Sequence, residues 1–254
     1  MTADVGHTYH RIHSVRTLVL EHRFAVLLCA LTLLLIGSPL VRALGPGTHQ
    51  NLADLVILTL FVTVLLSAVF AVSTTWATEI IALLFAIPAA VLQGLQTWIA
   101  RDGLAIAGHI SGILFLTFAV LLILRFIFAS RRVSSDMICA SLCVYLLLGI
   151  LGAIAYSLFY YLDPTSFAFS FAKNGGAEVM RFGGERTFIA IYYSFVTMST
   201  LGYGDIVPTS SLARTCAALQ AVVGQLYLAV LVARLVGLHI VHSNECSATG
   251  ARDN

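Results

Sequence analysis

Long apolar runs are the feature that most limits how this chain can fold. A helix that spans a membrane needs about 20 mostly apolar residues, and six stretches meet that need. They cover residues 24–41, 55–72, 80–98, 104–128, 137–161 and 212–241. The composition agrees, because 59% of the 254 residues are hydrophobic and only 10% are charged, which is too apolar for a soluble domain. We therefore expect an all-α membrane protein with six transmembrane helices in a lipid bilayer.

The few polar and charged residues argue against several classes of function. The formal net charge is +2, and the arginines stand at the ends of apolar runs, so we expect no nucleic-acid partner. The five cysteines lack the spacing of metal ligands or extracellular disulfides. Cys139 and Cys143 lie one helical turn apart, so a metal or redox site is an alternative to simple packing for this pair. No nucleophile, base and orienting group cluster in the sequence, so we expect neither an enzyme nor a small-molecule substrate.

Basic residues at the ends of the spans predict the orientation, because they accumulate on the cytoplasmic side. Before the first span stand Arg11, Arg16 and Arg23, and after the fourth stand Arg125, Arg131 and Arg132. Both groups are expected in the cytoplasm, so six spans place both termini there. We expect a cell membrane, specifically the inner membrane of a prokaryote. The first run could instead be a signal peptide, although the sequence after it is a poor cleavage region.

Between the fifth and sixth spans, a short apolar stretch leads directly into a glycine-containing motif. The stretch at 188–196 is too short to span, and residues 197–205 read TMSTLGYGD. This segment resembles the tetrameric potassium channels, whose motif reads Thr, any, any, Thr, any, Gly, Tyr, Gly, usually followed by Asp. The match is complete and lies between two spans, a context that makes it specific. A glycine turn after an amphipathic hairpin is the alternative.

The resemblance implies a selectivity filter in which backbone oxygens replace the water shell of a potassium ion. The ion-binding residues are then Thr200, Leu201, Gly202, Tyr203 and Gly204. Directing successive carbonyls toward one axis needs left-handed backbone, which glycine adopts at little steric cost. One motif per chain implies a homotetramer, since each ring of oxygens takes one from each of four chains. No cofactor is implied beyond the K+ ions themselves.

Residues around the motif are expected to hold the filter in place. By the resemblance, the filter support comprises Tyr192, Tyr193, Val196, Thr197, Ser199 and Asp205. The two tyrosines occupy positions where the family carries paired aromatics, so both are expected beside Tyr203. Some members bond the outer aspartate to a glutamate, but Val196 stands at that position here. Asp205 is therefore expected to bond another group, such as one of these tyrosines.

The last span is expected to line the pore. The expected hinge and cavity residues are Gly224, Gln225, Leu228, Val232 and Val236. Gly224 lies about where the family places a bending glycine, and the alternative is that it only permits close helix packing. The residues after it recur at helical spacings, with Val236 near a constriction. His239 and His242 follow, and they are candidate pH sensors because histidine titrates nearest physiological pH.

The expected domain organisation places the pore in the second half of the chain. The parts are a cytoplasmic segment at 1–23, a four-helix region of unknown role at 24–132, a pore domain at 137–241 and a short cytoplasmic tail at 242–254. The pore domain comprises an outer helix at 137–161, a pore helix at about 187–199, the filter at 200–204 and an inner helix at 212–241.

The fourth span lacks the pattern of a voltage sensor. Between 104 and 128 its ionisable residues are His109 and Arg125, whereas steep voltage dependence needs several gating charges per subunit. We therefore expect weak voltage dependence. Two other functions stay open. One is a non-conducting membrane sensor or assembly subunit. The other is a component of a potassium uptake system, although such proteins normally carry four related loops in one chain.

Overall fold

Six long helices form most of the structure, a computed structural model that describes residues 23–43, 50–72, 76–98, 102–130, 134–170 and 187–250. They are α2 (Arg23–Ala43), α3 (Gln50–Val72), α4 (Trp76–Trp98), α5 (Asp102–Ala129), α6 (Ser135–Leu162) and α8 (Ser211–Gly250). Between the last two lie the 3-10 helix η1 (Pro164–Ser166), strand β1 (Phe167–Phe169), helix α7 (Thr187–Met198) and strand β2 (Ile206–Pro208). The expected all-α membrane fold is confirmed, with one small pair of strands added to it.

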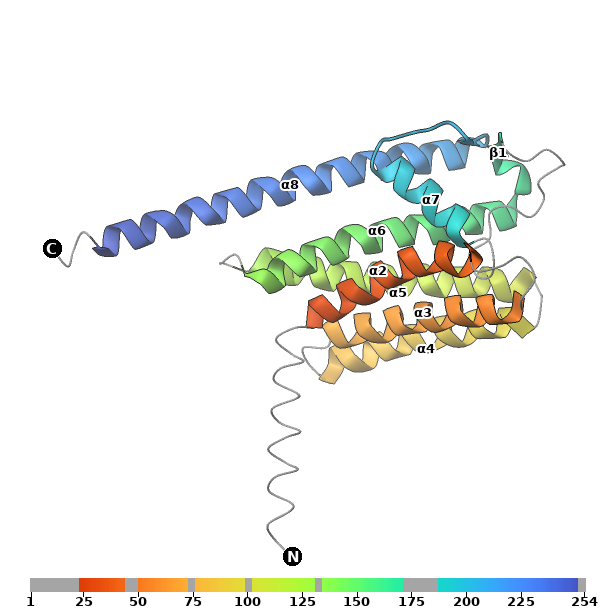
Figure 1. The fold of residues 1–254 in the computed structure, drawn as a ribbon, viewed down its shortest axis with the longest axis horizontal. Helices are drawn as coiled ribbons and strands as arrows, with labels where there is room; N and C mark the ends of the chain where they lie inside the picture. Colours follow the sequence, from red (N-terminus) through yellow and green to blue (C-terminus); the bar gives the residue numbers. More distant parts are fainter. Residues whose placement is uncertain are drawn as a thin grey trace, which may run out of the picture.

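Helices α2 to α6 pack side by side as a bundle, and α8 lies beyond α6 (Figure 1). The core is formed by buried side chains from all five helices of this bundle, among them Leu27, Leu65, Ala86, Leu116 and Leu147. The short helix α7 lies between α6 and α8 at one end of the molecule. From there α8 runs alongside α6 and continues past the end of the bundle toward its carboxyl end (Figure 1).

Four helices are long and apolar enough to cross a membrane over their described residues. They are Trp76–Leu95, Gly103–Ala129, Ser135–Leu162 and Ser211–Gly237. The apolar parts of α2 and α3 are shorter there, at Arg23–Gly37 and Leu58–Ala71. The number of six spans therefore stays a prediction, although each predicted span falls on one of the six long helices.

Helix α8 extends beyond its predicted end. It continues to Gly250 rather than ending at residue 241, so the predicted tail at 242–254 begins as helix. The reason is that no proline or glycine occurs between residues 238 and 249 to end the helix.

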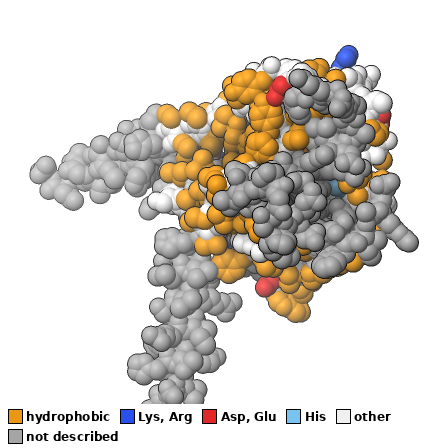
Figure 2. All heavy atoms as spheres, turned by 45° about the vertical axis from the view of Figure 1, so that its right-hand side comes forward, with side chains coloured by type: hydrophobic (Ala, Val, Ile, Leu, Met, Phe, Trp, Pro, Cys, Tyr) orange, Lys and Arg blue, Asp and Glu red, His pale blue; other side chains and the backbone are white. Residues whose placement is uncertain are grey.

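The apolar surface of α8 is largely uncovered in the single chain. Its exposed large apolar residues are Leu212, Leu219, Val222, Val223, Leu226, Leu228, Val230, Val232 and Val236. Figure 2 shows that hydrophobic side chains also cover much of the other described surface on the visible face. Apolar patches of this extent need lipid or another protein chain against them.

A short antiparallel pair of strands ties the end of α6 to the segment that follows α7. Asp163 ends α6, and its side chain accepts hydrogen bonds from the backbone and hydroxyl of Thr165. These bonds lower the pKa of Asp163, with the hydroxyl contributing most. The β1 strand then pairs with β2, so that Phe167 lies opposite Pro208. The chain just beyond residues 200–204 is therefore fixed to the end of α6.

Candidate functional site

Helix α7 ends in a hydrogen-bonding pattern that leads the chain into residues 200–204, which we call the glycine loop. The N–H of Leu201 donates to the Val196 carbonyl, and the N–H of Thr200 donates to the Thr197 carbonyl, both at 3.0 Å. These are the two bonds of a Schellman motif, whose first residue beyond the cap is left-handed. Thr200 is that residue, with a φ of 60°. The residue that terminates the helix is thus also the first residue of the loop.

Left-handed backbone recurs at every second residue of the glycine loop. Gly202 has a φ of 56° and Gly204 a φ of 77°, whereas Leu201 and Tyr203 between them have negative φ values. In an ordinary strand, successive peptide groups point to opposite sides. The alternation seen here turns them to the same side of the chain. The loop can therefore present a row of carbonyl oxygens along one edge.

The glycine loop has little cover from the described part of the chain. Leu201 is 59% exposed and Tyr203 is 66% exposed. A Cβ atom added at Gly202 or Gly204 would meet no other atom within 4 Å. At membrane depth, irregular backbone is tolerated only where protein surrounds it or water contacts it. The loop is therefore shaped for an environment that the single chain does not supply.

Tyr192 and three backbone contacts fix the residue that follows the loop. The Tyr192 hydroxyl donates to Asp205 Oδ2 at 2.7 Å, and its ring stacks on Tyr203 with centroids 6.4 Å apart. The Asp205 carbonyl accepts from the Ser170 N–H at 2.9 Å and from its hydroxyl at 3.1 Å, and Asp205 Oδ1 accepts from the Ile206 N–H at 3.1 Å. The bond to Asp205 raises the pKa of Tyr192 to about 12, so the phenol keeps its proton near neutral pH. The prediction that Asp205 bonds a tyrosine is confirmed.

Within the chain, Tyr192 stacks on Tyr203 whereas Tyr193 packs against other rings, which corrects the expectation that both tyrosines lie beside Tyr203. Tyr193 is buried, and its ring meets those of Tyr156 at 4.9 Å and Phe167 at 5.4 Å in edge-to-face geometry. Consecutive side chains on a helix differ in direction by about 100°, so Tyr192 and Tyr193 point to different parts of the structure. Within the chain, Tyr193 fixes α7 to α6 and β1.

The other predicted support residues lie at the carboxyl end of α7. Val196 and Thr197 hold the glycine loop through their backbone carbonyls, as described above. The Ser199 hydroxyl donates to the Phe195 carbonyl at 2.7 Å. The Thr200 hydroxyl donates to the Ser199 carbonyl at 2.6 Å. Backbone atoms therefore do more of the positioning than the side chains that the sequence highlighted.

Helix α8 packs closely against the end of α7 at Gly224. A Cβ atom there would lie 2.4 Å from the Met198 carbonyl oxygen and 2.6 Å from Met198 Cγ, well inside the optimal separation of nonbonded atoms. The helix continues without a break through this position. This contact with Met198 supports the explanation that Gly224 permits close helix packing. The role of Gly224 as a hinge stays a prediction.

The predicted cavity residues do not stand out from their neighbours on α8. Gln225, Leu228, Val232 and Val236 are all exposed, but so are residues on other faces of the same helix. Exposure in the single chain thus does not select the face that lines a cavity. The side chains of the candidate pH sensors, His239 and His242, lie outside the described residues.

Two residues of α8 that sequence analysis did not single out make long-range contacts. Gln220 bonds Ser194, which lies 26 positions earlier in the chain. Arg234 bonds carbonyl groups at the end of α5, more than 100 positions earlier. A polar residue within an otherwise apolar span was the available signal for both.

These features define a class of helical membrane protein. Its members have two long helices on either side of a short helix and of a loop in which every second residue has left-handed backbone. Residues 144–238 match the family model described as Ion channel. The match begins within α6, includes α7 and the glycine loop, and ends within α8. The match covers somewhat over a third of the chain. Comparisons with curated proteins and with solved structures found no match.

Proposed function

We propose that the protein is a potassium-selective channel in which the glycine loop is the selectivity filter. The supporting observation is the left-handed backbone at Thr200, Gly202 and Gly204, because it allows successive carbonyl oxygens to face one axis. Rings of such oxygens can replace the hydration shell of K+. The Thr200 hydroxyl uses its hydrogen on the Ser199 carbonyl, so its oxygen keeps lone pairs for an ion at the inner end.

Helix α7 adds an electrostatic contribution. Aligned peptide dipoles place about half a negative charge at the carboxyl end of a helix. That end of α7 leads directly into the filter, so it favours a cation at the inner side. The helix thereby stabilises the ion before its water shell is removed.

The proposed assembly is a homotetramer in a cell membrane, with both termini in the cytoplasm. Each chain carries one filter segment, and four are needed for closed rings of oxygen ligands. The uncovered filter and the apolar surface of α8 are the faces that other copies and lipid would cover. Native mass spectrometry of the purified protein should give four times the 27.3 kDa of one chain, and a monomer would contradict the proposal.

Ion flux into liposomes tests the proposed selectivity directly. Purified protein should admit potassium and rubidium while sodium is largely excluded, because the carbonyl rings replace the hydration shell of the larger ions. Equal entry of sodium and potassium would overturn the proposal. A tetramer that passes neither ion would indicate a non-conducting membrane subunit instead.

We also propose that opening depends only weakly on voltage. Within α5, the ionisable residues are Asp102, His109 and Arg125, and steep dependence requires several charges per subunit to move across the field. The conductance of purified channels in planar bilayers should therefore change gradually with voltage. A steep curve would contradict this part of the proposal.

A further inference from the structure

A chain of hydrogen bonds joins three helices behind the glycine loop. The Tyr156 hydroxyl of α6 donates to Gln220 Oε1 of α8 at 2.5 Å. Gln220 Nε2 donates to Ser194 Oγ of α7 at 2.7 Å, and Ser194 Oγ donates to the Gly149 carbonyl of α6 at 2.6 Å. Ser194 is fully buried and Tyr156 is 1% exposed. Gln220 itself is partly buried, so the network runs from the edge of α8 into the protein interior, where losing the Gln220 bond leaves the Tyr156 hydroxyl without water.

The backbone of α6 is shaped to admit this network. A Cβ atom at Gly152 would lie 2.2 Å from Gln220 Nε2 and 2.5 Å from Ser194 Oγ. A Cβ atom at Gly149 would lie 2.3 Å from the Phe195 ring. A larger residue at either position would force the Phe195 ring or the Gln220 and Ser194 side chains to move. The absence of side chains at Gly149 and Gly152 thus gives the Phe195 ring and the Gln220 amide room to pack against α6.

The chemistry of the network requires an amide at residue 220. Its carbonyl oxygen accepts from Tyr156 while its NH2 group donates to Ser194, so one side chain acts as acceptor and donor at once. A carboxylate lacks the donor, and an apolar side chain lacks both. A largely buried network in which each member is satisfied holds its elements in a single arrangement. Gln220 therefore fixes α7 between α6 and α8.

The network lies close in sequence to the bonds that shape the filter. Ser194 precedes Val196 by two residues on α7, and the Val196 carbonyl accepts the Leu201 N–H at 3.0 Å. A displacement of α7 at Ser194 would carry the Val196 carbonyl with it. The filter backbone would then lose the geometry set at its first turn.

We propose that Gln220 is a positioning residue for ion selectivity: through Ser194 it fixes the end of α7 and so the shape of the filter. This inference rests on the proposed potassium selectivity, and it names Gln220 as a residue that this selectivity requires. The first test is Gln220→Met, which keeps an unbranched side chain but removes both hydrogen bonds. The potassium-to-sodium permeability ratio in liposomes should fall about tenfold, which is the scale of effect when a buried polar group loses its partner.

A second variant separates positioning from overall stability. Gln220→Met leaves the buried Tyr156 hydroxyl without its acceptor, which lowers stability in its own right. Combining it with Tyr156→Phe removes that hydroxyl and should restore the unfolding temperature of the tetramer. The permeability ratio should stay low in the double variant, because Ser194 still lacks its amide partner. Recovery of wild-type selectivity in the double variant would overturn the inference, as would an unchanged ratio in Gln220→Met.

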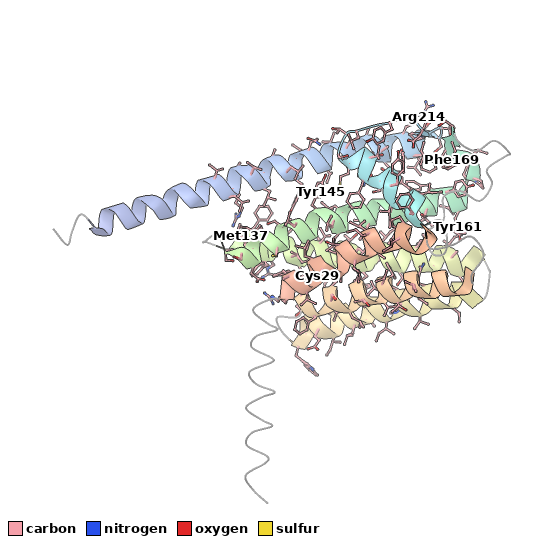
Figure 3. All side chains as sticks on the ribbon, viewed as in Figure 1. Cys29, Met137, Tyr145, Tyr161, Phe169 and Arg214 are labelled. Carbon is pink, nitrogen blue, oxygen red and sulfur yellow. The ribbon has the colours of Figure 1, made fainter. Side chains whose placement is uncertain are left out.

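A matched control removes a similar bond elsewhere on α8. The Tyr227 hydroxyl donates to the Ser141 carbonyl of α6 at 2.7 Å, and its ring stacks on that of Tyr145, which Figure 3 shows between α6 and α8. Tyr227→Phe should leave the permeability ratio unchanged, since this contact lies away from α7. A drop as large as that of Gln220→Met would contradict a specific role for Gln220.

The wild-type protein separates the two proposals. If it admits sodium as readily as potassium, the proposed function fails. If it is selective and Gln220→Met is equally selective, only the positioning role fails.

Discussion

At the scale of single residues, Thr200 does two things that are usually divided between residues. It is the left-handed residue that ends α7, and it is the first residue of the glycine loop. Left-handed backbone is unusual for a β-branched residue and costs about 1–2 kcal/mol. The two Schellman bonds and the Thr200 hydroxyl bond to Ser199 offset that cost. The end of the helix therefore sets the starting direction of the loop.

The first prediction concerns the backbone of Gly202. Gly202→Ala should abolish selective potassium flux in liposomes, because an L-residue at a φ of 56° is disfavoured by about 1–2 kcal/mol in each of the four chains. The cause is conformational, since a Cβ atom at this position meets nothing within 4 Å in the single chain. Gly103→Ala is the control, because Gly103 also has open space but no positive φ. Normal selectivity in Gly202→Ala would show that the loop does not need this conformation.

The second prediction concerns the bond between Tyr192 and Asp205. Tyr192→Phe keeps the ring that stacks on Tyr203 but removes the hydroxyl that donates to Asp205 Oδ2. Hydrogen bonds to charged groups contribute about 1.5–3 kcal/mol, so conducting periods in single-channel records should become at least tenfold shorter. Phe188→Leu is a control, since the Phe188 ring stacks on Tyr192 but carries no group that can bond Asp205. Unchanged conducting periods in Tyr192→Phe would mean that the hydroxyl does not stabilise the exit of the loop.

At the scale of helices and strands, the contact between α7 and α8 decides how Gly224 should be understood. Gly224→Ala should lower the unfolding temperature of the tetramer, because the added Cβ would lie 2.4 Å from a backbone oxygen of Met198. A backbone atom cannot move aside as the end of a flexible side chain can. The matched control is Gly237→Ala in the same helix, where a Cβ meets nothing within 4 Å and alanine favours helix by about 1 kcal/mol.

The two substitutions also separate packing from bending. If Gly224 serves only as a point where α8 bends, Gly224→Ala should change channel opening without lowering the stability of the tetramer. If close packing is its role, stability should fall while Gly237→Ala is neutral or stabilising. Equal stability for both variants would contradict the packing explanation.

The sequence predicts these elements well because their signals are local. The six apolar runs correspond to the six long helices. The helix predicted at about 187–199 corresponds to α7, Thr187–Met198. The absence of a glutamate at residue 196 was enough to predict that Asp205 bonds another group, with a tyrosine as one candidate, and Tyr192 is that group. The pairing of β1 with β2 and the bonds of Gln220 were not predictable, because they join segments about 26 to 64 positions apart without any repeating pattern. For the same reason the sequence could not tell that Tyr193 faces α6.

At the scale of the whole molecule, Arg234 links the segment that matches the ion-channel family model to the helices that precede it. Its Nη2 atom donates to the carbonyls of Ile127, Phe128 and Ser130 at 2.8 to 2.9 Å. Its guanidinium carbon lies 5.2 Å from the centre of the Phe128 ring. Carbonyls in the last turn of a helix have no partner within that helix, and a positive charge is favoured there. A residue of α8 thus caps the carboxyl end of α5.

The last prediction follows from this cap. Arg234→Gln removes the charge and shortens the side chain, so the last turn of α5 should open more often. Hydrogen exchange of the Ser130 amide, which donates to Phe126 and Ile127 within that turn, should become about tenfold faster, since bonds to charged groups contribute about 1.5–3 kcal/mol. Arg125→Gln is the matched control, because Arg125 is an exposed arginine near the same end of α5. Unchanged exchange at Ser130 in Arg234→Gln would contradict the cap.

The same variant distinguishes this cap from the Gln220 network. Arg234 holds the part of α8 far from α7, whereas Gln220 holds α7 itself. Arg234→Gln should therefore change the open probability of single channels and leave the potassium-to-sodium permeability ratio as in wild type. A fall in that ratio would mean that the end of α8 and the filter are not independent. An unchanged open probability would mean that α5 does not influence opening through Arg234, and the four-helix region would then need another route to the pore.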